Sequence, residues 1–239
     1  MTVTTTGLTK AAGVAAAAAG AVFIAVQLGH PQLNLTTITT TNVFVRDVGK
    51  VLMCALALAG ITGMYLSQVR RMGVFGLVGY LVFAANYLSI MCTTYIAAFV
   101  LPTLAGSNPA YVKDVIALST SRGTVTGDLG ALAVSWGPVQ AVLYLSGGLL
   151  FGIALFRAGV LARWAAVLLA VSGFASVVLT LMPDAFYRLL AFPNAIAMIA
   201  LGVSLWRSQR TASAETSPVV TSASPAVVPA ARTKPSTVR

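Results

Sequence analysis

The chain has 239 residues, of which 58% are hydrophobic and only 8% are charged, and its formal net charge is +10. Soluble globular domains carry about 25% charged residues, so this composition excludes a water-soluble globule. A net positive charge is also typical of nucleic-acid-binding proteins, and the placement of the charges along the chain decides whether that class applies.

Six apolar segments are long enough to cross a bilayer, since about 20 helical residues span a hydrocarbon core of about 30 Å. The segments lack the two-residue alternation of membrane β-barrel strands. We therefore predict an all-α fold, namely a polytopic transmembrane helix bundle with one domain over 11–206. The predicted spans are 11–29, 48–68, 73–100, 137–156, 164–182 and 189–206.

The first apolar segment has a second interpretation. Lys10 precedes an Ala-rich run, which is the arrangement found in signal peptides. However, no cleavage pattern of small residues is followed by a soluble domain, and the run ends just before His30 and Pro31. We expect an uncleaved helix that follows a short cytoplasmic N-terminus, 1–10.

Basic residues are divided unevenly between the two sets of loops. Ten of the 15 Lys and Arg residues fall on the side of the termini, and five fall on the other side. All four Asp residues fall on that other side, whereas Glu215 falls with the termini. Because basic loops stay in the cytoplasm, we predict an N-in/C-in topology. The positive charge therefore indicates orientation and gives no argument for nucleic-acid binding.

The longest loop, 102–136, is predicted on the outer side. It contains Arg122 and Asp128, which exclude a seventh span, and its part 112–119 predicts a short helix. After about residue 206 the sequence is rich in Ser, Thr, Ala, Val and Pro with scattered basic residues. This composition predicts a disordered basic cytoplasmic tail over 207–239.

Uncharged polar side chains gather in the outer halves of the predicted spans, while the inner halves are mostly Ala, Leu, Val and Gly. We expect these polar groups to form hydrogen bonds between helices. The alternative is a cavity that opens toward the outer leaflet and binds a lipid, an isoprenoid or another amphipathic molecule. The side chains that would line this cavity are Asn86, Tyr87, Gln140, Tyr144 and Asn194.

Two pairs of small residues each have two interpretations. Cys54 and Cys92 fall at a similar predicted depth, so a disulfide is the alternative to two buried thiols. Gly148 and Gly152 have the GxxxG spacing, which is typical of close contacts between membrane helices. We expect this contact within one bundle, and a homodimer contact is the alternative.

The supply of catalytic and metal-binding side chains is small. His30 is the single histidine, and one ligand does not make a metal site. Asp47 and Asp184 begin predicted spans, where the helix dipole and exposed pairing with Lys50 and Arg188 explain them. No spacing brings two acids together for acid–base chemistry. We therefore predict no catalytic residue, no metal site and no cofactor.

Two segments carry a resemblance to known proteins. They are LFRAGVLARW at 155–164 and the PNAI sequence at 193–196 that leads to LWR at 205–207. Together with His30 and Pro31 before a Thr-rich loop, they resemble uncharacterised multi-pass membrane proteins common in actinobacteria. The resemblance implies a helical bundle in the plasma membrane and carries no established activity.

From these features we expect a multi-pass protein of a bacterial plasma membrane. We expect it to bind membrane lipids or a membrane protein partner without catalysis, as an accessory or immunity-type protein. The alternative is an uncoupled transporter or permease for an uncharged or amphipathic solute, since ion-coupled transport usually requires buried ionisable residues. A membrane-embedded enzyme acting on lipid or isoprenoid ranks below both, because it needs an acid, base or nucleophile at bilayer depth.

Overall fold

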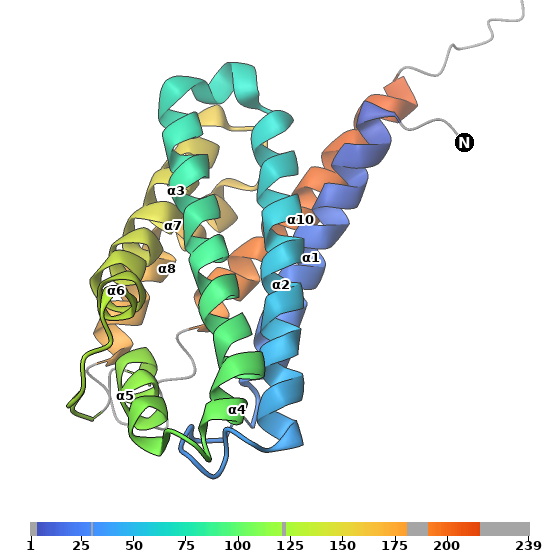
Figure 1. The fold of residues 1–239 in the computed structure, drawn as a ribbon. Coiled ribbons are helices and arrows are strands. Elements are labelled where there is room, and N and C mark those ends of the chain that lie inside the picture. The colour runs from blue at the N-terminus through green and yellow to red at the C-terminus, as the bar shows by residue number, and fades with distance from the viewer. Residues whose placement is uncertain (1–3, 30, 121–122, 181–190, 216–239) are drawn as a thin grey trace, which may run out of the picture.

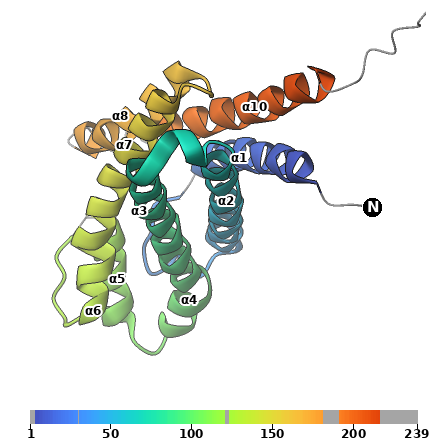
Figure 2. The same ribbon diagram turned by 90° about the horizontal axis from the view of Figure 1, so that it is seen from above.

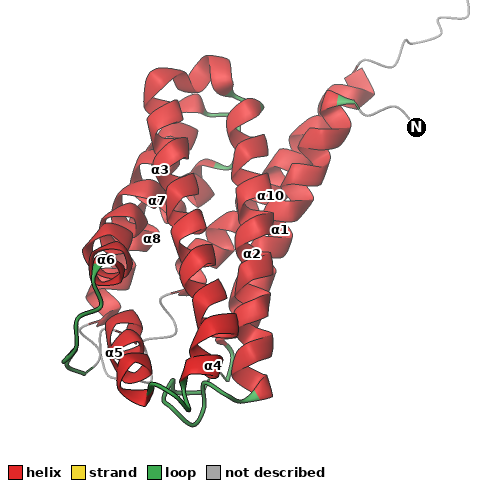
Figure 3. Cartoon of the chain, viewed as in Figure 1, coloured by secondary structure: helices red, strands yellow, loops and turns green. Residues whose placement is uncertain are grey.

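A computed structural model describes residues 4–29, 31–120, 123–180 and 191–215. Within these ranges the chain is all-α, without strands, and loops occupy mainly the two ends of the molecule (Figure 3). Six long helices in the described ranges run alternately between these ends (Figure 1). They are α1 (Thr5–Gln27), α2 (Thr41–Leu66), α3 (Val69–Tyr95), α7 (Gln140–Ala158), α8 (Arg163–Thr180) and α10 (Ala191–Glu215).

Four helical segments of the described residues are long and apolar enough to cross a membrane. They are Thr5–Gln27, Thr41–Leu66, Val69–Leu104 and Ala131–Ala158. The predicted helical bundle is thus confirmed, with four of its six predicted spans meeting this criterion. The apolar stretch of α8 that is described, Arg163–Phe174, is shorter. The predicted spans 164–182 and 189–206 both extend into 181–190, which lies outside the described residues.

Two of the membrane-length segments contain π-helical turns. α3 continues through η1 (Ile96–Val100) into α4 (Leu101–Leu104), and α6 (Ala131–Val134) continues through η2 (Ser135–Val139) into α7. Pro102 follows the first turn and Pro138 lies inside the second. Because proline lacks an amide hydrogen and clashes with the carbonyl four residues earlier, each helix widens locally instead of keeping regular α-helical bonds.

Several helices are longer than the sequence predicted. α1 begins at Thr5, where the Thr4 side chain accepts a hydrogen bond from the Gly7 amide at 3.1 Å. α2 begins at Thr41 instead of 48. α10 continues to Glu215, so the first part of the predicted disordered tail, 207–239, is helical. The part from 216 onward lies outside the described residues.

Buried apolar side chains form two separate clusters. The main core lies between the long helices and includes Phe83, Phe151, Met64, Leu155 and Leu201. The second core lies at the end of the molecule away from the termini (Figure 1). Its buried members are Ile38, Val43, Leu101, Val112, Val115, Ile116, Leu129 and Trp136. We call the region built on this second core, residues 33–43, 96–120 and 123–136, the cap.

The cap contains most of the predicted outer loop, 102–136. The short helix predicted at 112–119 is α5 (Pro109–Thr120), and it begins where Asn108 Oδ1 accepts a hydrogen bond from the Tyr111 amide at 3.3 Å. Proline at the first helical position costs no hydrogen bond, because that amide has no intrahelical partner. The loop is therefore a folded layer with its own core.

Asp114 attaches the segment after α5 to that helix. Its carboxylate is buried and accepts hydrogen bonds from the backbone amides of Thr126 at 3.0 Å and Gly127 at 2.8 Å. Because backbone donors stabilise the ionised form, these bonds hold the pKa of Asp114 below its ordinary value of 3.8.

We expect the segment 123–130 to loosen from α5 in strong acid. Since the folded-state pKa of Asp114 is lowered, its carboxylate stabilises the cap above the ordinary pKa and loses this effect as the pH falls through the folded value. Hydrogen exchange should show protected amides in 123–130 near neutral pH and faster exchange, corrected for intrinsic rates, in strong acid. Asp114→Ala should exchange fast at both. Amide protection in 123–130 that changes neither in acid nor in the Asp114→Ala variant would contradict this role.

α1 and α10, the first and last helices, lie side by side at one edge of the bundle (Figures 1 and 2). Glycines let their backbones touch. A Cβ placed on Gly202 would lie 2.6 Å from the Ala17 amide nitrogen, and one on Gly20 would lie 2.7 Å from Ile199 Cγ1 and in contact with the Ala195 carbonyl oxygen. Only glycine permits this separation, so the pair depends on these positions.

The same device joins α7 to α8. A Cβ on Gly152 would lie 2.6 Å from the Ala170 amide nitrogen, and one on Gly148 would lie 3.1 Å from the Leu169 carbonyl oxygen. α8 of the same chain therefore lies against Gly148 and Gly152, and the alternative of a homodimer through these glycines stays a prediction. The contact is within one bundle, as small residues at membrane helix interfaces permit.

Candidate functional site

The five side chains predicted to line a cavity come from three helices. Asn86 and Tyr87 lie on α3, Gln140 and Tyr144 on α7, and Asn194 on α10. The Tyr87 hydroxyl donates a hydrogen bond to Asn194 Oδ1 at 3.3 Å and lies within electrostatic range of Tyr144. Gln140 Oε1 accepts a hydrogen bond from Ser89 Oγ at 3.2 Å. Three of the five, Tyr87, Tyr144 and Asn194, are thus linked to one another, and Gln140 is bonded to Ser89 outside the group.

Most of this group is closed off inside the bundle. Asn86, Tyr87 and Asn194 are buried, and Gln140 and Tyr144 are half-buried. Asn86 differs from the others, because within the described residues neither Nδ2 nor Oδ1 of its side chain has a hydrogen-bond partner. An unpaired buried amide costs about 1–3 kcal/mol. Asn86 therefore holds unused hydrogen-bonding capacity in the interior.

An ion pair lies at the junction of the two cores. Lys50 Nζ donates to Asp47 Oδ1 at 2.8 Å, and Asp47 is only 1% exposed. Asp47 Oδ2 has no partner among the described residues. On the same buried face of α2, Val43 belongs to the cap core and Cys54 to the main core. The pair thus lies inside a membrane-length helix.

This burial corrects the expectation of an exposed pair that caps a helix start. The sequence analysis placed the start of α2 at 48, whereas the helix begins at Thr41 and carries Asp47 in its second turn. The missed signal was spacing: Asp47 follows Val43 by four residues and precedes Cys54 by seven, which places all three on one helical face. An ionisable side chain buried in a membrane helix is a functional candidate.

The two cysteines are free thiols in the structure, so the disulfide alternative is not formed. Cys54 is buried in the main core, within electrostatic range of Tyr87, while Cys92 is exposed on α3. The two side chains therefore lie in different environments. Among the described residues no three His, Cys, Asp or Glu side chains form a group that could hold a metal ion. His30, Asp184 and Arg188 lie outside the described residues.

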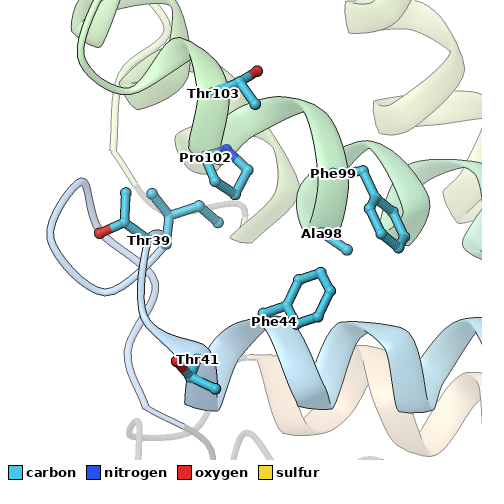
Figure 4. A pocket seen from close by; sticks show the side chains of 8 residues that line it. Thr39, Thr41, Phe44, Ala98, Phe99, Pro102 and Thr103 are labelled. Carbon is cyan, nitrogen blue, oxygen red and sulfur yellow. The ribbon is translucent and has the colours of Figure 1, made fainter.

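A pocket of about 360 Å³ opens in the cap between the start of α2 and the π-helical continuation of α3. Figure 4 shows Phe44 pointing from α2 toward Ala98 and Phe99. The rings of Phe44 and Phe99 meet edge to face, with centroids 5.5 Å apart. We call this the α2–η1 pocket, and it is lined by Ile38, Thr39, Thr41, Phe44, Ala98, Phe99, Pro102 and Thr103.

The chemistry of the α2–η1 pocket is apolar with hydrogen-bond acceptors. None of its eight lining residues is charged. Thr39 Oγ1 donates to the Thr36 carbonyl at 3.1 Å, and Thr103 Oγ1 donates to the Val100 carbonyl at 2.7 Å. With their protons used, these hydroxyls keep lone pairs that can accept. The pocket suits an apolar chain that carries a neutral or cationic hydrogen-bond donor.

Large apolar side chains outside the pocket extend its surface along the helices. Val45, which follows Phe44 in the chain, is 61% exposed, and Tyr95, whose ring centroid lies 4.7 Å from that of Phe99, is 52% exposed. In a helix of membrane length such side chains face lipid. The sequence did not predict this pocket, because 33–43 and 96–103 come together only through the cap core. The sequence feature that could have indicated the pocket is Pro102 with the aromatic residues that precede it.

The chain matches no protein-family model, and neither a curated protein nor a solved structure is similar to it.

Proposed function

We propose that the protein is a non-catalytic lipid-binding protein of a bacterial plasma membrane, and that a lipid or similar amphipathic molecule occupies the α2–η1 pocket. The observation that carries this proposal is the pocket itself: apolar walls, threonine acceptors and no charged lining residue. Ligand pockets typically combine apolar walls with a few polar groups in this way. The neighbouring exposed apolar surface gives lipid a route of entry from the bilayer.

The topology that we propose is six spans with both termini in the cytoplasm. Two observations support it. The six long helices run alternately up and down, and α1 begins at the same end of the molecule at which α10 finishes (Figure 1). The start of α1 and the end of α10 share that end with the α2–α3 and α7–α8 connections. Arg70, Arg71, Arg157 and Arg163 lie in the helix ends beside these connections. Basic residues favour the cytoplasmic side, so the cap would lie at the outer surface.

Reporter fusions at Ser107 and Ser213 test this topology. We expect a fusion after Ser107, in the cap, to give a signal with a reporter that works only outside the cytoplasm. A fusion after Ser213, near the end of α10, should give a signal with a reporter that works only in the cytoplasm. The positive-inside rule gives the physical reason. An outward signal from Ser213 would contradict the proposed orientation.

Binding without catalysis is favoured by the groups at the pocket. A catalysed reaction requires a group that takes up or delivers a proton, or a nucleophile activated by a base. The lining side chains are hydrocarbons, aromatic rings and threonines, two of which already donate to backbone carbonyls. These groups hold an amphipathic molecule but do not activate one.

The double substitution Phe44→Ala and Phe99→Ala tests lipid binding. Deleting one ring removes about 40 Å² of apolar contact with the lipid and weakens binding by about 1 kcal/mol. With both rings deleted, lipid retention should fall at least about tenfold. The protein would be extracted with its native bilayer in lipid particles, washed, and analysed by mass spectrometry of bound lipids and proteins. One lipid class enriched in the wild type and lost from the variant is the expected result.

Phe174→Ala provides the matched control, because Phe174 is 52% exposed on α8 and does not line the pocket. It should retain lipid as the wild type does. If the pocket variant and the control bind equal amounts of lipid, the pocket is not the site. A protein partner that co-extracts reproducibly, and is lost with the pocket variant, would assign the surface to a protein instead.

Uncoupled passage of an uncharged solute is the second candidate, and it is favoured by the interior of the bundle. Asn86 carries an unpartnered buried amide, and π-helical turns interrupt the helices that contain α3 and α7. Interrupted helices with free polar groups mark pathways in transporters. Flux of glycerol into vesicles should then be lost in Asn86→Leu and unchanged in the variant that lacks Phe44 and Phe99. Equal flux with and without protein would exclude this candidate.

A further inference from the structure

A second pocket in the cap has the opposite chemistry from the first. It has a volume of about 450 Å³ and lies between the turn at 33–36 and α5. We call it the α5 pocket. Its lining residues are Leu33, Asn34, Leu35, Thr36, Lys113, Ile116, Ala117, Gly123 and Thr124.

The floor of the α5 pocket belongs to the cap core. Ile116 is a buried member of that core, and Leu33 and Leu35 pack against it. Ala117 and Gly123 approach closely, since a Cβ on Gly123 would lie 3.4 Å from Ala117 Cβ. Gly123 also has φ +98°, a conformation that side chains rarely adopt. These contacts give the pocket apolar walls that are held by the fold of the cap.

Unlike the α2–η1 pocket, the α5 pocket has a positively charged lining residue and an amide that can donate hydrogen bonds. Asn34 Oδ1 accepts from the amides of Thr36 at 3.0 Å and Thr37 at 2.9 Å and from Thr36 Oγ1 at 2.6 Å. This orients the Asn34 side chain and leaves its Nδ2 hydrogens as the available polar group. Lys113 adds a positive charge at an exposed position, and no carboxylate pairs with it among the described residues.

The acid nearest to Lys113 in the chain does not neutralise the pocket. Asp114 is buried, and its carboxylate accepts hydrogen bonds from the amides of Thr126 and Gly127. None of the nine lining residues is acidic. An ammonium group and an amide donor above apolar walls are complementary to an anion attached to a hydrocarbon chain.

We propose that the α5 pocket binds the phosphate of an anionic phospholipid at the membrane surface on the cap side, with Lys113 and Asn34 Nδ2 as donors and the adjoining chain against Ile116 and Leu35. The inference rests on the proposed orientation of the cap in the membrane but not on lipid in the α2–η1 pocket. The two sites differ in charge, so separate substitutions test them.

The test uses the full chain in bilayer discs that contain equal amounts of phosphatidylglycerol and phosphatidylcholine. Native mass spectrometry would measure which lipid stays bound. We expect the wild type to prefer phosphatidylglycerol about fivefold, and Lys113→Gln to lose this preference, because one charge-assisted hydrogen bond is removed. Lys113→Arg keeps the charge and should retain the preference.

Two further variants separate a site from general surface charge. Lys10→Gln removes one positive charge from the opposite end of the molecule and should leave the preference unchanged. Ala117→Trp keeps Lys113 but fills the pocket, and it should abolish the preference while the variant still melts as the wild type does.

Three outcomes would overturn the proposal. The first is equal retention of both lipids by the wild type. The second is an equal loss of preference in Lys10→Gln and Lys113→Gln. The third is complete displacement of phosphatidylglycerol by an equal amount of oleate, which would assign the pocket to fatty acids. The pair Phe44→Ala and Phe99→Ala should not change the preference, which keeps a failure of the α2–η1 proposal distinguishable.

Discussion

Gly20→Leu should lower the apparent melting temperature of the detergent-solubilised protein by about 10 °C, because a clash of this kind costs about 3 kcal/mol or more. A Cβ at Gly20 would contact the Ala195 carbonyl oxygen and lie 3.1 Å from the Ile199 amide nitrogen of α10. Backbone atoms cannot rotate away as a flexible side chain can, so α1 and α10 would have to separate. Heating followed by size-exclusion chromatography would measure the loss of folded protein.

Ala21→Leu is the matched control for this substitution. Ala21 is the next residue of α1 and is exposed, so its larger side chain would enter lipid or detergent. We expect this variant to melt within about 2 °C of the wild type, as surface substitutions away from special features usually cost little. If Gly20→Leu is as stable as Ala21→Leu, then α1 and α10 do not meet through this glycine.

Lys50→Met should destabilise the protein by about 3 kcal/mol, because it leaves the buried Asp47 carboxylate without its counter-charge. Asp47 Oδ1 is held by Lys50 at 2.8 Å, and Oδ2 has no partner in the described part of the chain. The carboxylate would have to become protonated or draw water into the junction between the two cores. The measurement is the same thermal assay.

The double variant Asp47→Leu with Lys50→Met tests the cause of that loss. Replacing both members of a buried ion pair by apolar residues is often neutral, whereas removing one is costly. We therefore expect the double variant to recover to within about 1 kcal/mol of the wild type. A double variant as unstable as Lys50→Met would show that Lys50 acts through other contacts instead of through Asp47.

The predicted polar group shows what the spacing of residues along single helices can predict and what it cannot. The sequence pattern placed Asn86, Tyr87, Gln140, Tyr144 and Asn194 in the same halves of their predicted spans. The structure bonds Tyr87 to Asn194, brings Tyr144 within electrostatic range of Tyr87, and bonds Gln140 to Ser89. Spacing did not reveal which of them would be satisfied. The bond between Tyr87 and Asn194 joins residues 107 positions apart, and the unpaired amide of Asn86 depends on what the neighbouring helices present.

The cap shows how little of the tertiary structure the sequence predicts in a segment that has no apolar stretch of membrane length. Arg122 and Asp128 predict that the loop 102–136 lies outside the membrane, and a helix is predicted at 112–119. Its folding onto the loop before α2 was not predicted. Ile38 and the α5 side chains Val112 and Val115 belong to the same buried core although more than 70 residues separate them, and no local sequence pattern encodes this association.

The sequence by itself determined that the chain is an all-α bundle of membrane-length helices, because length and apolarity are properties of each segment alone. It also determined that charge separates the two ends of these helices. Only the tertiary structure decided that Asp47 is buried, that Gly148 and Gly152 face α8, and that two pockets of opposite chemistry lie in the cap. Burial and shape depend on which surfaces meet, and those contacts join segments that lie far apart in the sequence.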